Sequence, residues 1–262
     1  MCELLAMSAN VPTDIVFSFT GLVERGGVTG PHRDGWGITF YDGLGCRTFK
    51  DSHPSCDSEV ASLLKSYPIK STNVISHIRQ ANRGRVCLEN THPFSRELWG
   101  RNWTFAHNGQ LSNYQQQLKT KRFMPVGGTD SELAFCHLLD RLAEHYAHRR
   151  PSRMQAFRFL AQEGLKLQRY GVFNMLLTDG VYLLALCSNH LHWLTRQAPF
   201  GQAQLIDTEM VVDFTQETSI NDVVSVIATR PLTSNEQWTK MAPGSWLLLR
   251  EGSVIDHGGA TD

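Results

Sequence analysis

Short stretches rich in β-branched and aromatic residues recur along this chain, and several follow one another across turns too short to hold a helix. Asp-Gly pairs at 42–43 and 179–180 end two of these stretches, and Asp-Gly is typical of tight β-hairpin turns. Hairpins pair strands antiparallel, whereas parallel strands need a crossover of a dozen or so residues. The pattern therefore predicts a mostly antiparallel sheet built from residues 2–7, 35–42, 72–79, 102–108, 172–180, 181–188, 191–196, 222–229 and 245–251.

Other stretches repeat apolar residues at every third or fourth position, as the buried face of a helix does. These stripes run through 130–149, 154–165 and 15–23, and the last of them ends at Arg-Gly-Gly 25–27. Helices inserted between groups of hairpins predict an α+β fold with helices layered on antiparallel sheets. No internal repeat or low-complexity linker divides the sequence, so we expect a single domain over 2–262.

The charge balance argues against two classes of partner. With 25 basic and 25 acidic residues, the chain has no net charge that would favour nucleic acid or an anionic membrane. The cationic run at 148–153 lies between two predicted helices and is interpreted as an exposed connection. The longest apolar run, 181–187, is far shorter than the ~20 residues that span a bilayer, and Glu3 interrupts any signal-peptide pattern. We therefore expect a soluble, cytoplasmic protein.

The cysteine spacing gives no sign of a metal centre or a disulfide framework. The six cysteines, at 2, 46, 56, 87, 136 and 187, include no Cys-x-x-Cys pair. Five of them are interpreted as reduced packing residues, and we expect neither a metal nor a cofactor. Cys2 differs, because removal of Met1 would leave a thiol and a free α-amine on one residue. That is a nucleophile with its own base, although a packed strand residue is the simpler interpretation.

Four polar stretches stand next to predicted strand ends, at 76–84, 91–94, 107–113 and 127–132, and each also has a purely structural interpretation. Arg79 could lay its stem along apolar surface with its head in water. Asn108-Gly109 is a common hairpin turn. Thr129 could cap a helix whose Glu132 reaches back to it, as in a capping box.

Together with Cys2, these stretches supply what amide hydrolysis through a thioester requires. A thiolate attacks the carbonyl while the α-amine accepts the thiol proton and later delivers it to the leaving group. The oxyanion needs fixed donors, which the Asn108 amide and the Gly109 backbone N–H would provide at a tight turn. A substrate with an α-carboxylate and an α-ammonium group needs one cation and one anion, and Arg79 and Asp130 fit those roles.

Five motifs in this order resemble a known family: MCELLAMSAN at the N-terminus, SHIRQAN, THPF, AHNGQLSN and GGTDSE. They look like the glutaminase domain of class II glutamine amidotransferases, which are N-terminal-nucleophile hydrolases. RDGWGITFYDG at 33–43 further resembles the stand-alone bacterial members. The resemblance covers most of the chain and is most specific over 2–132. It implies an αββα fold of four layers, with two antiparallel sheets stacked between helices.

The resemblance also implies a role for each matching residue. Cys2 matches the family nucleophile. Asn108 and Gly109 match the oxyanion hole, and Gly109 is also placed near the substrate backbone. Arg79 and Asp130 match the residues that hold the α-carboxylate and the α-amino group of glutamine.

Further polar groups carry weaker signals. His-Arg-Asp at 32–34 is similar to a kinase catalytic loop, but no Gly-rich loop or Asp-Phe-Gly accompanies it. His190 and His192 alternate along a predicted strand without a third ligand placed by sequence, and are interpreted as surface residues. His92 and His107 are candidates for shaping the pocket, with no role assigned.

The sequence thus predicts a glutamine amidotransferase-like enzyme that hydrolyses the γ-amide of glutamine or of a γ-glutamyl amide, releasing glutamate and ammonia or an amine. Because the chain ends where a glutaminase domain is expected to end, transfer of ammonia would need a separate acceptor or synthase protein. One alternative is an amidase for a larger γ-glutamyl compound. Residues 80–83 favour it, because they read Gln-Ala-Asn-Arg where synthase-fused relatives often have Trp-Ala-Thr-His. A catalytically silent regulatory subunit is a second alternative, against which the presence of every motif residue argues.

Overall fold

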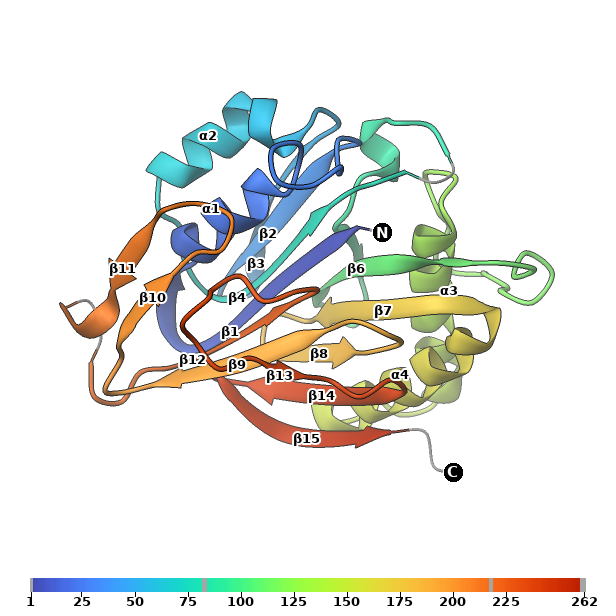
Figure 1. Cartoon of the computed structure of the whole chain (residues 1–262). Helices are drawn as coiled ribbons and strands as arrows, with labels where there is room; N and C mark the ends of the chain where they lie inside the picture. The colour runs from blue at the N-terminus through green and yellow to red at the C-terminus, as the bar shows by residue number, and fades with distance from the viewer. Residues whose placement is uncertain (1, 82–83, 217–218, 260–262) are drawn as a thin grey trace.

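Two large antiparallel sheets form the centre of the molecule in a computed structural model that describes residues 2–81, 84–216 and 219–259 (Figure 1). The first sheet has seven strands in the order β13 (Thr239–Lys240), β9 (His192–Gln197), β12 (Val223–Ala228), β1 (Glu3–Asp14), β4 (Lys70–Ile78), β2 (Trp36–Asp42) and β3 (Gly45–Asp51). The second has six, in the order β15 (Ser253–Gly259), β14 (Ser245–Arg250), β8 (Tyr182–Leu186), β7 (Gly171–Thr178), β6 (Asn102–Leu111) and β5 (Phe94–Glu97). A separate hairpin joins β10 (Gln202–Gln204) to β11 (Val211–Asp213).

Every strand expected from the sequence is present, with shifted ends. The largest shift is in β1, which continues to Asp14 across an irregular register between Ser8 and Thr13. The interior strands β1, β4, β6 and β7 are buried on both faces over most of their length.

The three expected helices are also present, together with one that was not expected. They are α1 (Val16–Glu24), α3 (Asp130–His145) and α4 (Arg153–Leu167), and the additional helix is α2 (Glu59–Ser66). Ser152 and Gln155 form a reciprocal capping box at the start of α4, which satisfies two backbone donors that helix geometry leaves without partners. Short 3₁₀ turns lie at Ser55–Asp57, Leu88–Asn90, Gln168–Tyr170 and Phe214–Gln216. None of the helices in the described ranges is long and apolar enough to cross a membrane.

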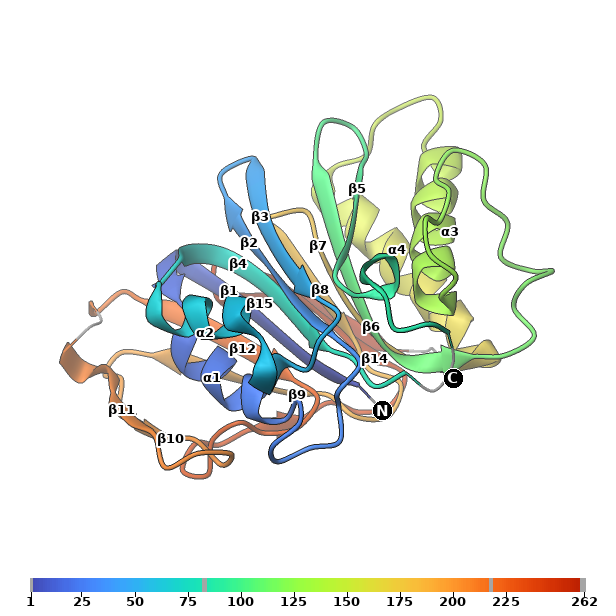
Figure 2. The same ribbon diagram turned by 90° about the horizontal axis from the view of Figure 1, so that it is seen from above.

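The helices cover the outer faces of the sheets, which gives four layers (Figure 2). An apolar cluster around Trp36 joins α1 and α2 to the first sheet. A second cluster around Phe135 joins α3 and α4 to the second sheet. A third, around Leu176, draws its side chains from both sheets and fills the space between them. The αββα arrangement expected from the sequence is confirmed.

The connection at 148–153 is largely exposed, as expected, although Arg153 begins α4 and pairs with Asp179 at 2.9 Å. The interpretation of five cysteines as packing residues is wrong for three of them. Cys136 and Cys187 are buried, whereas the thiols of Cys46, Cys56 and Cys87 lie at partly exposed positions. All six are free thiols.

Candidate active site

Segments from both sheets and from α3 meet at one end of the stacked sheets. β1 pairs with β4 so that Glu3 lies opposite Ile78, which brings Cys2 beside the residues that follow β4. Side chains alternate along a strand, and Leu4 packs between the sheets, so Cys2 shares the face that looks toward the second sheet. There its backbone meets Asn108 of β6.

A cavity of about 170 Å³ opens at this point. Four of the five predicted site residues line it: Cys2, Arg79, Gly109 and Asp130. The remaining wall is made by Gln80, Ala81, His92, His107, Gln110, Thr129, Ser131 and Val172. The structure therefore brings together residues that lie far apart in the sequence.

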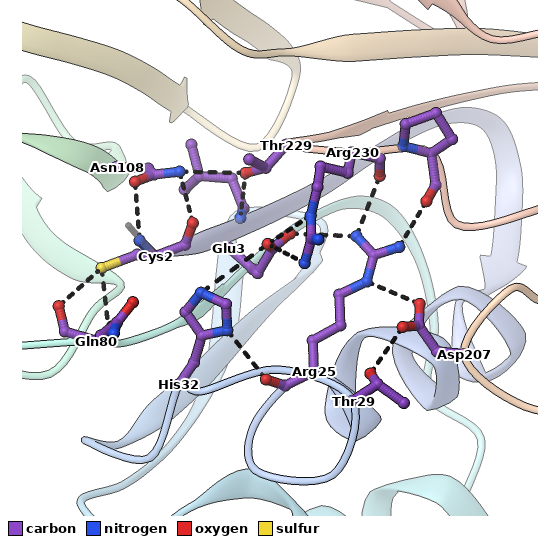
Figure 3. Close-up of polar contacts among 12 residues, drawn as sticks. Cys2, Glu3, Arg25, Thr29, His32, Gln80, Asn108, Asp207, Thr229 and Arg230 are labelled. Atoms are coloured by element: carbon purple, nitrogen blue, oxygen red, sulfur yellow. Dashed lines mark hydrogen bonds and ion pairs between the residues drawn. The ribbon is translucent and has the colours of Figure 1, made fainter.

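The fifth predicted residue, Asn108, holds the backbone of Cys2 at both ends. Its Oδ1 accepts a hydrogen bond from the Cys2 nitrogen at 3.0 Å, and its Nδ2 donates to the Cys2 carbonyl oxygen at 2.6 Å (Figure 3). Nδ2 also lies 3.4 Å from Oγ1 of Thr229. The Asn108 amide, which the sequence suggested as an oxyanion donor, thus fixes the backbone position of Cys2.

Asn108 and Gly109 lie inside strand β6 rather than in a turn, so both the hairpin-turn interpretation and the expected tight-turn setting are wrong. The pair lies opposite Asn174 and Phe173 of β7. The glycine is required by close approach, because a Cβ at this position would overlap the Val172 carbonyl group. The absence of a side chain leaves the Gly109 backbone open to the cavity.

The Cys2 sulfur lies against the backbone of Gln80. The Gln80 N–H donates to Sγ at 3.3 Å, and Sγ lies 3.5 Å from the Gln80 carbonyl oxygen. Desolvation raises the pKa of the Cys2 thiol, an effect that the Gln80 N–H and the charge of Arg79 only partly offset. A thiol whose pKa is raised needs a nearby base to form the thiolate.

Arg79 follows β4 directly and its guanidinium is buried, so the interpretation of a side chain with its head in water is wrong. Nη1 donates to the carbonyl oxygens of Arg85 at 3.1 Å and Asp34 at 3.5 Å. No described residue accepts a hydrogen bond from Nε or Nη2 of Arg79. A guanidinium offers five N–H donors in a planar fork, so this geometry suits a carboxylate in the cavity.

Asp130 is the first residue of α3, where the positive end of the helix dipole stabilises an anion. Its Oδ2 accepts from the Leu111 N–H at 2.7 Å, and its Oδ1 accepts from the Ser131 N–H at 2.9 Å. Thr129 caps the helix as expected, accepting from the Glu132 N–H at 3.2 Å. The reciprocal half of the capping box is absent, because the Glu132 carboxylate binds the Gly127 N–H and Arg96 instead.

The sequence profile of one family, described as "Glutamine amidotransferases class-II", matches residues 1–261. The chain belongs to this family. Among solved structures, that of a "predicted glutamine amidotransferase from Pseudomonas aeruginosa PA01" has a TM-score of 0.79 and 52% sequence identity, over 97% of this chain and 100% of the other.

Other relatives extend the comparison. "Putative glutamine amidotransferase YafJ" of Escherichia coli (strain K12) is 64% identical over 97% of this chain and 100% of its own length. A protein of the same description from Haemophilus influenzae is 46% identical over 97% of this chain and 86% of its own. The structure of glutamine phosphoribosylpyrophosphate amidotransferase from B. subtilis matches with a TM-score of 0.63 at 16% sequence identity, over 98% of this chain and 49% of the other chain. This match shows that the fold is shared.

Two histidines, His92 and His107, line the cavity, as the sequence suggested. Nε2 of His107 lies 3.2 Å from the Val172 carbonyl oxygen, which can only accept, so Nε2 carries the proton. Burial lowers the pKa of His107, and in the neutral ring Nδ1 then accepts from the Ser131 hydroxyl at 2.8 Å. His92 stacks on His77 with ring centroids 4.1 Å apart, and no described residue bonds to either of its ring nitrogens. Burial holds the pKa of His92 well below its usual value.

Several residues that support the candidate site were missed in the sequence. Asp34, the last residue of the His-Arg-Asp stretch, accepts from the Ala81 N–H at 2.7 Å and so holds the segment that follows Arg79. Thr229 accepts from the Leu4 N–H at 2.9 Å, across 225 positions of sequence. Glu3 carries a usable signal of a buried partner, because it is a charged residue within an apolar strand. We used it solely as an argument against a signal peptide.

Two further histidine candidates lie outside the cavity lining. His190 is exposed, and Nδ1 of His192 lies 3.0 Å from the Thr229 carbonyl oxygen. The described residues contain no group of three or more histidine, cysteine or acidic side chains that could hold a metal ion. Of the segment at 80–83, Gln80 and Ala81 line the cavity, whereas Asn82 and Arg83 lie outside the described residues.

Proposed function

We propose that this protein hydrolyses the γ-amide of glutamine or of a γ-glutamyl amide through a thioester on Cys2. The products are glutamate and either ammonia or an amine. The observation that carries the proposal is the single cavity that places Cys2 together with Arg79, Gly109 and Asp130. A thiol is thereby combined with one cation and one anion suited to the two α-groups of an amino acid.

In the proposed reaction, the α-amine of Cys2, left free by removal of Met1, accepts the thiol proton. The thiolate attacks the γ-carbonyl carbon, and the Asn108 amide and Gly109 N–H stabilise the oxyanion of the tetrahedral intermediate. Collapse of the intermediate breaks the C–N bond, and the α-ammonium group returns the proton to the departing amine. Water then attacks the γ-glutamyl thioester, glutamate leaves, and the thiol is restored.

Arg79 and Asp130 bind the substrate in this proposal. The guanidinium of Arg79 pairs with the α-carboxylate, and the carboxylate of Asp130 accepts from the α-ammonium group. Backbone N–H groups fix both Asp130 oxygens, so the anion is preorganised before the substrate arrives. The position of the α-groups then sets the γ-carbonyl beside Cys2.

A second cavity favours the alternative of a larger γ-glutamyl substrate. It has a volume of about 400 Å³, and Gln110, Thr129 and Asp130 belong to the walls of both cavities. Its other described walls include the exposed polar side chains of Ser112 and Gln115. A substrate larger than glutamine could extend into this space without displacing the groups that surround Cys2.

Turnover of a substrate panel tests the proposal. Glutamate release should be measured from free glutamine, from γ-glutamyl amines and from γ-glutamyl peptides, with wild type, Cys2→Ser and Cys46→Ser. Wild type and Cys46→Ser should hydrolyse at least one compound at the same rate, while Cys2→Ser retains a small residual rate because a hydroxyl is a weaker nucleophile. A folded wild type from which Met1 has been removed, and which releases glutamate from none of them, would favour the silent regulatory subunit.

We also propose a cytoplasmic location, which the free thiols favour because cytosolic reductants keep cysteines reduced. A separate acceptor or synthase protein is the partner that we propose for any transfer of ammonia. Ammonia that accumulates in the medium in step with glutamate, even when cell extract is added, would argue against such a partner.

A further inference from the structure

The residue after Cys2 is a buried, ion-paired glutamate. Only 3% of the surface of Glu3 is exposed. Its Oε2 lies 3.2 Å from Nη1 of Arg25, and its Oε1 lies 2.7 Å from Nη2 of Arg230 (Figure 3). Nε2 of His32 stands 4.0 Å from the same Oε1. A carboxylate in such a place is costly to desolvate unless its partners satisfy it, and here two cations do so.

The network continues behind Glu3 through the buried guanidinium of Arg25. Nε of Arg25 pairs with Asp207 at 2.8 Å, and its Nη atoms donate to the carbonyl oxygens of Arg230 at 3.2 Å and Pro231 at 2.5 Å. Thr29 donates in turn to Asp207 at 2.7 Å. Two cations therefore balance two anions, and the loop that holds Arg25 and His32 meets the segment of Arg230 at the side chain of Glu3.

Glu3 acts on the face of β1 opposite to the reactive thiol. Neighbouring side chains of a strand point to opposite faces, so Cys2 looks toward the second sheet and Glu3 looks toward the helical layer of α1. On the thiol side, Asn108 and the Gln80 N–H hold Cys2. In the proposed mechanism Cys2 carries a free α-amine, and chain ends tend to fray unless they are tied down.

We propose that Glu3 is a positioning residue for Cys2, an inference that rests on the proposed function. The ion pairs with Arg25 and Arg230 hold the first residues of β1 from the helix side, so that the α-amine and Sγ of Cys2 keep their places relative to Asn108 and Gln80. Glu3 is absent from the cavity wall, so it acts through the backbone of Cys2 and not on the substrate. Its loss should therefore change the reaction step and leave substrate binding intact.

The test compares Glu3→Gln with Glu236→Gln. Glu236 is a matched control, because it is a partly buried glutamate paired with Arg196 at 2.6 Å and bonded to Thr233 at 2.8 Å. Both variants should lose thermal stability. Glu3→Gln alone should lower kcat, on the order of tenfold or more, with KM unchanged, since small displacements of reacting groups are known to cost up to about 10² in rate. It should also slow the alkylation of Cys2 by iodoacetamide, followed by peptide mapping.

Equal kcat values and equal alkylation rates for the two variants would overturn the proposal, and so would a change confined to KM. If Glu3→Gln does not fold, Arg230→Met decides, because Arg230 is 56% exposed and tolerates substitution better. That variant should lower kcat to a smaller extent, and an unchanged kcat would count against Glu3. If the wild type hydrolyses nothing, the proposed function fails, while the alkylation rates still test the positioning of Cys2.

Discussion

Replacing Gly109 by alanine perturbs the candidate oxyanion hole through packing alone. The added Cβ would overlap the Val172 carbonyl oxygen and would lie 2.6 Å from its carbon and 2.7 Å from Nε2 of His107. The carbonyl group belongs to the backbone, and the His107 ring is buried with a contact at each nitrogen, so neither group can move aside cheaply. β6 and β7 would have to separate at this point, where Gly109 lies opposite Phe173.

The expected magnitudes follow from that clash. Overpacking of this kind costs about 1–3 kcal/mol of unfolding free energy, and each kcal/mol lowers Tm by about 2–4 °C in a chain of roughly this size. Movement of the Gly109 N–H out of place should lower kcat by roughly 10²–10³, as loss of one oxyanion donor does elsewhere. Tm by calorimetry and glutamate release at 25 °C measure the two effects separately.

Gly201→Ala is the matched control, because nothing lies within 4 Å of a Cβ built at that position. It should leave both Tm and kcat unchanged. The reasoning would be refuted by a Gly109→Ala protein that keeps the Tm and the kcat of the wild type. A lowered Tm with an unchanged kcat would retain the packing argument and remove Gly109 from the oxyanion hole.

The remaining predictions concern binding, labelling and pH. Arg79→Lys keeps the charge but loses the planar fork, so kcat/KM should fall about tenfold for each ~1.4 kcal/mol of transition-state stabilisation that is lost. An unchanged kcat/KM on every γ-glutamyl compound tested would remove Arg79 from the site. A chloro-ketone analogue of glutamine should alkylate Cys2 once per chain and spare the partly exposed thiols elsewhere; label spread evenly over several cysteines in a peptide map would contradict this. Burial lowers the pKa of His77 to about 3 and that of His92 well below its usual range, so unfolding takes up protons at acidic pH. The unfolding free energy should therefore fall as pH drops below about 6.5, by up to about 1.4 kcal/mol per pH unit for each ring. His92→Gln should make the unfolding free energy depend less steeply on pH. Identical slopes for the variant and the wild type would contradict this prediction.

The interior strands were predictable from the sequence because they are rich in β-branched and aromatic residues. The strands missed in the two large sheets, β3, β5, β13 and β15, stand at the four edges of those sheets. Edge strands bury one side at most, and their sequences are correspondingly short or polar, as in Gly45–Asp51. α2 was missed for a similar reason, since it buries just two residues, Ala61 and Leu64.

The motifs pointed to Cys2, Arg79 and Asp130, which line one cavity, while their chemical roles stay predictions. The candidate site was not predictable where the role depends on tertiary contacts. Asn108-Gly109 was expected in a turn, because local preference for turns could not reveal that β7 pairs with this segment.

The supporting contacts were hidden for the same reason. Glu3 meets Arg25 and Arg230 across 22 and 227 positions of sequence, and Asp34 meets Ala81 across 47. Such pairs leave no local pattern in a single sequence. A charge within an apolar strand, as at Glu3, is the one local sign that a buried partner must exist.

The most direct test of the central claim is the hydrolysis rate of a protein that carries an uncleaved extension on Cys2. The Cys2 nitrogen donates to Oδ1 of Asn108 at 3.0 Å beside the cavity, so an extension would convert the base into an amide and crowd the site. Glutamate release should be compared for untagged protein, for protein extended after Asp262, and for protein extended before Cys2, with Met1 removal and the extensions verified by intact mass. The account predicts full activity for the first two and none for the third, with equal Tm values for all. Undiminished hydrolysis by protein with its N-terminal extension intact would contradict the N-terminal-nucleophile mechanism.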